Sequence, residues 1–131
     1  MKIILDTHII LWWFEDTNRL SKKQKKTIEN ADQQNPLLIS DISLWEIATL
    51  YELGRIKLKL PLRDWLMQAF APPLVRLCGI TAAIAATVAS LPESFNRDPA
   101  DRIITATALV HGATLVTNDE RIIRSKIVSI L

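Results

Sequence analysis

Four acidic residues that lie far apart in the sequence share a setting that suits catalysis. Asp6 and Asp119 each follow an apolar run typical of a β-strand, in "KIILD" and "TLVTND". Asp101 lies in the first turn of one predicted helix, and Glu46 lies one turn into another that follows a strand. In a parallel α/β sheet, strand ends and the starts of the next helices share the rim where ligands usually bind. We therefore expect the four carboxylates to converge.

A cluster of carboxylates has a characteristic chemistry. Two charges about 4 Å apart, at an effective dielectric constant near 20, repel each other by roughly 4 kcal/mol. A divalent cation removes that repulsion, and Mg²⁺ and Mn²⁺ prefer oxygen ligands. The chain has only His8, His111 and Cys78 as nitrogen or sulfur ligands, which argues against zinc. The four acids therefore predict a site for Mg²⁺ or Mn²⁺.

Each acid also has a simpler explanation at a helix start. Asp6 and Asp119 are suitable caps for the segments that follow them. In "DPAD", Asp98 is a good cap, and Asp101 would then favour the positive end of the helix dipole. Glu46 stands three residues after a serine, which is the spacing of a capping box. None of these explanations accounts for the apolar stripe around Glu46, or for four acids at one rim.

The elements that must position these acids alternate along the chain. Such alternation predicts an α/β fold with a parallel sheet, and continuous apolar strands predict helices on both faces. Apolar runs predict five strands, at Lys2–Leu5, Pro36–Ile39, Leu74–Cys78, Thr114–Val116 and Ile127–Ile130. Helices are predicted at Thr7–Phe14, Ser21–Ala31, Asp41–Leu53, Leu62–Phe70, Thr81–Ser90 and Pro99–His111, the last of them capped by Gly112.

Length and composition indicate one domain, residues 1–131, with a substantial core. The chain is 49% hydrophobic, and its net charge is only +2, which neither requires nor excludes a nucleic-acid partner. Cys78 has no partner for an internal disulfide, which fits a reducing compartment. No targeting segment or membrane-length apolar run is evident, so we expect a cytoplasmic protein that is not in a membrane.

Several motifs together are similar to those of a known family. The segments "LDTH", "SLWEIA" followed by "LGRIKL", "RDPADRIITATA" and "LVTND" resemble the motif series of PIN-domain ribonucleases, and in particular the VapC-type toxins of type II toxin–antitoxin systems. The likeness spans nearly the whole chain. In motif order, the family's four acids match Asp6, Glu46, Asp101 and Asp119. Thr7 and Thr117 match small polar residues near that site, and Asp98 lies outside the set, as a cap or a supporting residue.

The resemblance implies a fold, an activity and partners. It implies a PIN-like fold with a five-stranded parallel sheet flanked by helices on both faces. It implies an endoribonuclease that hydrolyses RNA phosphodiester bonds with Mg²⁺ or Mn²⁺, held silent by a small antitoxin protein. It also implies a homodimer, which the many aromatic and apolar side chains support. These are Trp12, Trp13, Phe14, Trp45, Leu50 and Tyr51.

Other interpretations of the sequence stay open at this point. A haloacid-dehalogenase-type phosphotransferase also begins with an Asp after its first strand, but it needs a second Asp where His8 stands. A receiver-like switch domain needs an acid after the middle strand, where the sequence reads "LCGITA". A PIN domain that processes RNA outside a toxin pair, or that only binds RNA or protein, fits as well. Basic residues that could contact RNA are Arg55, Lys57, Lys59, Arg97 and Arg102, and the sequence does not rank them.

Overall fold

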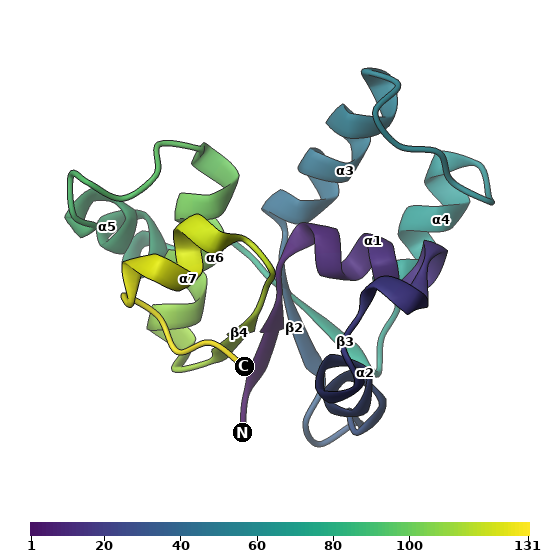
Figure 1. Ribbon diagram of the computed structural model, residues 1–131, viewed down its shortest axis with the longest axis horizontal. Helices are drawn as coiled ribbons and strands as arrows, with labels where there is room; N and C mark the ends of the chain where they lie inside the picture. The colour runs from purple at the N-terminus through teal and green to yellow at the C-terminus, as the bar shows by residue number, and fades with distance from the viewer.

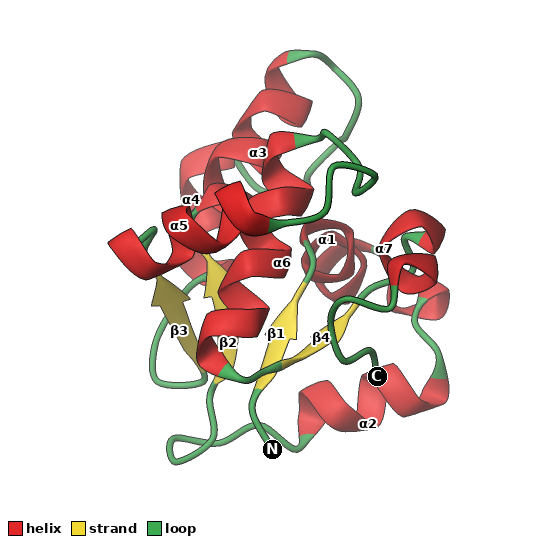
Figure 2. Cartoon of the chain, turned by 90° about the vertical axis from the view of Figure 1, so that its left-hand side faces the viewer, coloured by secondary structure: helices red, strands yellow, loops and turns green.

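The computed structural model describes residues 1–131 and is built around one parallel sheet (Figure 2). Its strands are β1 (Ile3–Leu5), β2 (Leu37–Ser40), β3 (Val75–Cys78) and β4 (Thr114–Val116), in the order β3-β2-β1-β4. All neighbouring strands are parallel. Helices therefore connect the strands, and the carboxyl ends of all four strands lie at one edge of the sheet.

Helices cover both faces of this sheet (Figure 1). All six predicted helices are present, with ends that differ from the prediction by no more than two residues. Gly112 has a φ of 62° and ends the α6 helix, as predicted. No helix has both the length and the apolar character that crossing a bilayer requires. The helices are α1 (Thr7–Glu15), α2 (Lys22–Glu29), α3 (Ile42–Glu52), α4 (Leu62–Ala69), α5 (Ala82–Ser90), α6 (Pro99–His111) and α7 (Glu120–Ser125), with a short 3₁₀ turn at Thr17–Arg19.

Alternate strand residues build two separate cores. Ile3 and Leu5 of β1 pack with helices α1, α2, α3 and α4, whereas Ile4 packs with α6 and α7 on the opposite face. Successive side chains of a strand point to opposite faces, so a strand that is apolar throughout is buried on both. Cys78 is buried at the end of β3 in the second core.

The prediction of a fifth strand at Ile127–Ile130 was wrong. This segment makes a single parallel bridge, between Leu115 and Ile130, at the edge of β4. The unpredicted helix α7 occupies the preceding residues, and Lys126 then adopts a left-handed conformation with φ 56°. Only five residues remain after this turn, and Val128 among them is buried in the second core. The chain therefore touches the sheet edge without forming a ladder, and the sheet has four strands.

Candidate active site at the carboxyl edge of the sheet

The four acids from the sequence analysis line one open cavity of about 230 Å³. Asp6 follows β1 and precedes α1, and Asp119 lies between β4 and α7. Asp101 lies in the first turn of α6, and Glu46 lies in α3. The predicted convergence is therefore present in the fold, since four separate elements bring these carboxylates to one place. The remaining lining residues are Thr7, His8, Leu11, Leu50, Asp98 and Arg121.

Asp6 is held rigidly at the bottom of this cavity. The residue is only 3% exposed, and its Oδ2 accepts a hydrogen bond of 2.6 Å from the Thr117 hydroxyl. The same hydroxyl oxygen accepts a bond of 3.0 Å from the Asp119 backbone N–H. Thr117 thus ties the end of β1 to the start of α7, and it fixes the relative positions of two of the acids. The Thr7 hydroxyl hydrogen-bonds the Ser43 hydroxyl at 2.9 Å and links α1 to α3 in a similar way.

Asp101 is supported by two polar residues that precede its helix. Asp98 caps α6, because its Oδ1 accepts a 3.1 Å hydrogen bond from the Asp101 backbone N–H. The Asn96 amide donates a 2.8 Å bond to Asp101 Oδ2. Asp98 is exposed while Asp101 is buried, so the capping interpretation is right for Asp98 and insufficient for Asp101.

The cavity disfavours negative charge. Burial raises the pKa of Glu46 to about 7, and the neighbouring carboxylates of Asp6 and Asp101 add to the rise. Burial likewise raises the pKa of Asp101 to about 6, with Asp6, Asp98 and Asp119 contributing repulsion. Helix caps in contact with solvent have no reason to behave in this way. Glu46 and Asp101 therefore lie among carboxylates whose negative charge is not fully balanced by nearby positive charge.

Arg121 partly supplies that charge and was missed in the sequence analysis. Its Nη2 lies 3.3 Å from Asp101 Oδ2 and 3.4 Å from Asp119 Oδ2, so one guanidinium nitrogen bridges two of the acids. The residue stands two positions after Asp119, in the first turn of α7. The prediction of α7 as a helix would have pointed to it, since a residue in that turn faces the rim.

The oxygen atoms of these side chains suit Mg²⁺ or Mn²⁺ in type. Both ions bind carboxylate oxygens in preference to softer ligands. No three Asp, Glu, His or Cys side chains are arranged closely enough to hold a metal ion as they stand. Arg121 occupies one oxygen of Asp101 and one of Asp119, so binding of a metal there requires this side chain to move.

His8 also lies at the cavity, where it positions a loop. Its Nε2 accepts a 2.9 Å hydrogen bond from the Asn118 backbone N–H, and its Nδ1 lies 3.6 Å from Asp6 Oδ2. Burial lowers the pKa of His8, although Asp6 opposes the shift. A neutral imidazole with Nε2 as acceptor therefore holds the β4–α7 loop over the acids.

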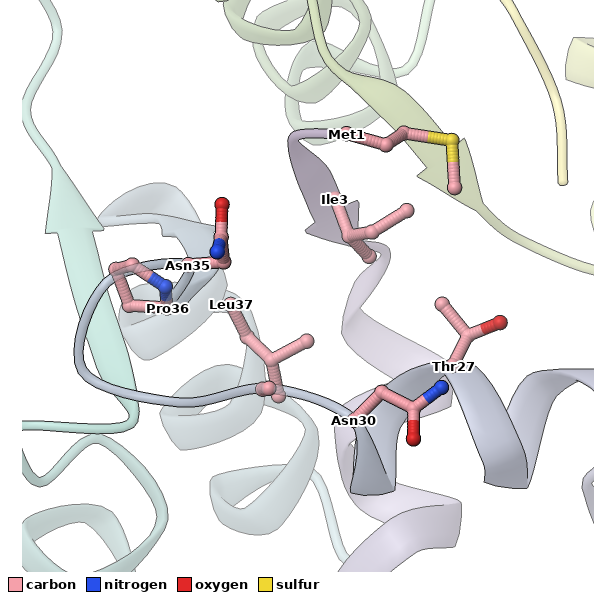
Figure 3. Close-up of a pocket in the computed structure, with 8 residues that line it drawn as sticks. Met1, Ile3, Thr27, Asn30, Asn35, Pro36 and Leu37 are labelled. Carbon is pink, nitrogen blue, oxygen red and sulfur yellow. The ribbon is translucent and has the colours of Figure 1, made fainter.

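A second hollow lies at the opposite edge of the sheet (Figure 3). It has a volume of about 160 Å³ and opens beside the amino-terminal ends of β1 and β2, next to α2. The side chains that line it, including Ile3, Thr27, Asn30 and Leu37, contain no Asp, Glu, His, Cys, Lys or Arg. This hollow therefore lacks the groups for acid–base or metal chemistry, and the acidic cavity is the candidate active site.

Comparison with known proteins agrees with the resemblance. Residues 3–127 match the family model of the PIN domain. This chain belongs to the PIN domain family. It is also 45% identical over 120 residues to the ribonuclease VapC22 of Mycobacterium tuberculosis, an alignment that covers 92% of this chain and 88% of that protein. The chain is thus a PIN protein of the VapC type, and the interpretations as a dehalogenase-type or receiver-like domain no longer apply.

Solved structures of similar fold include two VapBC complexes. The structure of VapBC2 from Rickettsia felis bound to a promoter DNA fragment aligns with a TM-score of 0.75 and 20% identity, over 100% of this chain and 98% of that one. The structure of VapBC-1 from nontypeable Haemophilus influenzae gives a TM-score of 0.72 and 17% identity, over 100% and 97%. At these identities the likeness shows that the PIN domain fold is shared.

Proposed function

We propose that this PIN-domain protein is a metal-dependent endoribonuclease and the toxin of a toxin–antitoxin pair. The observation that carries the proposal is the meeting of Asp6, Glu46, Asp101 and Asp119 in one cavity from four separate elements. The relationship to a VapC ribonuclease supports RNA as the substrate. The whole chain, residues 1–131, then acts as a single catalytic domain.

The residues of the cavity divide the work of hydrolysis. The four carboxylates would provide oxygen ligands for Mg²⁺ or Mn²⁺. Such an ion, when bound, would polarise the phosphodiester and favour ionisation of water. One carboxylate of the set accepts the proton of the attacking water. Thr117 and Asn96 keep Asp6 and Asp101 in place through their hydrogen bonds, so these ligands need little rearrangement.

The most direct experiment maps cleavage of total RNA by the purified protein. With Mn²⁺ we expect defined cleavage sites, and with EDTA we expect none, because the acids alone repel both the phosphate and each other. Sequencing of the new ends identifies the target. A cooperative melting transition shows that the purified protein is folded. If such protein leaves the RNA intact at millimolar Mn²⁺, the result would contradict the proposed activity.

The same proposal includes two protein partners. A small antitoxin is expected because the structural relatives include complexes described as VapBC and as toxin–antitoxin. Arg121 lies between Asp101 and Asp119, so a guanidinium fits there, and a basic side chain of an antitoxin that displaces Arg121 would meet the same two carboxylates. A short open reading frame next to this gene would support the pairing.

A homodimer is the second expected assembly. Trp45 is 59% exposed on α3, and Tyr51 and Leu53 near the end of α3 are 43% and 58% exposed. By contrast, Trp12, Trp13 and Phe14 are partly buried, with Arg19 stacked 4.4 Å from the Trp12 ring. Exposed Trp and Tyr are enriched in protein interfaces, so the α3 surface is the better candidate for contact with a partner.

Light scattering tests the dimer and this surface together. We expect the mass of a dimer at high micromolar concentration, and the mass of a monomer for Trp45→Glu. The matched control is Leu77→Glu, which places the same charge at another exposed apolar position, on the edge strand β3. A monomeric wild-type protein would refute the dimer. If Leu77→Glu gives monomers and Trp45→Glu does not, the dimer interface lies at β3 and not at α3.

A further inference from the structure

A third cavity, separate from the acidic cavity and from the hollow of Figure 3, carries positive charge. It has a volume of about 580 Å³ and is lined by residues of the loop connecting α5 to α6 and of the helix α7 and the segment after it. Its charged lining side chains are Arg97, Arg121 and Arg124, with no acid among the residues that form it. Ser94, Asn96 and Ser125 add neutral polar groups. Clefts of this size hold small ligands or one unit of a polymer.

The two cavities share one lining residue, Arg121, and are linked by a second, Asn96. Arg121 lines both cavities, and its Nη2 contacts Asp101 Oδ2. Asn96 lines the basic cavity and donates its hydrogen bond to the same oxygen of Asp101. The two cavities therefore adjoin, and an RNA strand with one phosphate among the acids has the basic cavity as a neighbouring site.

Two of the three arginines are available to a ligand. Arg97 is exposed and has no carboxylate within ion-pair distance. Arg124 has only Glu120 at 3.7 Å, one turn earlier in α7, and both side chains are largely exposed, so this pair contributes little. Arg102, in contrast, is used inside the protein, since its guanidinium donates to the Val88 and Asn96 carbonyl oxygens at 3.1 and 3.4 Å.

We propose that the cavity of Arg97, Arg121 and Arg124 binds a backbone phosphate of single-stranded RNA next to the phosphate that is cleaved. The guanidinium group is planar and matches phosphate with paired hydrogen bonds. Proteins that bind single strands use positive grooves of this kind to follow the backbone. The proposal rests on the proposed function, and it adds where the substrate continues beyond the acids.

The test measures binding of single-stranded RNA of mixed sequence, labelled with fluorescein, by anisotropy in EDTA. The variant is the pair Arg97→Ala with Arg124→Ala. The control is Arg63→Ala with Arg76→Ala, which removes the same charge from two exposed positions outside both cavities. We expect affinity to fall at least about tenfold for the first pair, as loss of charge-assisted hydrogen bonds predicts. The control should change little.

Salt dependence provides a second readout. Each phosphate contact in a single strand contributes roughly 0.7 to the slope of log affinity against log salt, so loss of the one phosphate held in this cavity should reduce that slope by about 0.7. The pair Arg97→Lys with Arg124→Lys keeps the charge and should bind RNA more tightly than the Ala pair. Equal weakening by the cavity pair and the control pair, or by the Lys and Ala pairs, would overturn the proposal, as would no weakening at all.

Two further outcomes separate this proposal from its alternatives. If binding of a Glu-rich peptide requires Arg97 and Arg124 and binding of RNA does not, the cavity belongs to a protein partner. That result would overturn the proposal. If the wild-type protein cleaves RNA and the Arg97→Ala, Arg124→Ala variant binds RNA as tightly as the wild type, this proposal alone is overturned. RNA binding that depends on the cavity, in a protein that never cleaves RNA, would instead overturn the proposed catalytic function and support the binding site.

Discussion

Asp101→Asn should reduce Mn²⁺-dependent RNA cleavage by more than about 100-fold, because loss of a residue that merely supports a metal ligand already costs roughly 10–100-fold. Asp101 is buried, and it receives hydrogen bonds or ion contacts from Asn96 and Arg121. Asn is nearly the same size, so the fold should persist while one negative ligand oxygen is lost. Asp6→Asn should have the same effect, since Asp6 lies at the base of the same cavity. The measurement is the initial rate of cleavage of a mapped substrate.

Asp98→Asn is the matched control for these two variants. It removes one negative charge from the same cavity, and Asn caps a helix as well as Asp does. The role of Asp98 in capping α6 should therefore survive, and most of the cleavage rate should remain. If Asp101→Asn and Asp6→Asn retain full activity, the four acids are not the metal site. If Asp98→Asn is as damaging as they are, Asp98 belongs among the essential acids.

Metal-free protein should lose stability as the pH rises from about 4 to about 7. Glu46 and Asp101 have folded-state pKa values of about 7 and about 6, above those of an unfolded chain. Between the two sets of values the folded state binds more protons than the unfolded state, so the free energy of unfolding falls with pH. Above the folded pKa values, it stays low. Thermal melts in EDTA across this range measure the effect.

Divalent metal should reverse this loss. At pH 8, Mn²⁺ at about 100 times its dissociation constant should raise the free energy of unfolding by roughly 2.7 kcal/mol, because it binds only the folded state. Asp101→Asn should stabilise the metal-free protein at this pH and weaken the response to Mn²⁺. If the acids were only helix caps, Asp101→Asn would destabilise the protein slightly, by about 0.3–1 kcal/mol, with no dependence on metal. A wild-type melting temperature indifferent to millimolar Mn²⁺ would support that simpler explanation.

Much of this protein could be predicted from local patterns in the sequence. Strands and helices follow from the spacing of apolar residues and from caps such as Asp98 and Gly112, which act over a few residues. The parallel arrangement then places residues that follow strands at one rim, which is why Asp6 and Asp119 could be grouped from their positions alone. Their role as metal ligands is a proposal, which cleavage rates of the Asn variants and melts with Mn²⁺ or EDTA test.

Other features depend on contacts between distant segments. Thr117 bonds Asp6 across 111 residues of sequence, and Arg121 meets Asp101 only because α7 packs beside α6. The four-strand sheet was decided in the same way. Ile127–Ile130 is as apolar as a strand, but the left-handed turn at Lys126 and the burial of Val128 leave it no room to pair fully. Periodicity determines which face of an element is apolar, whereas the side chains that meet at a rim depend on packing, which local pattern does not encode.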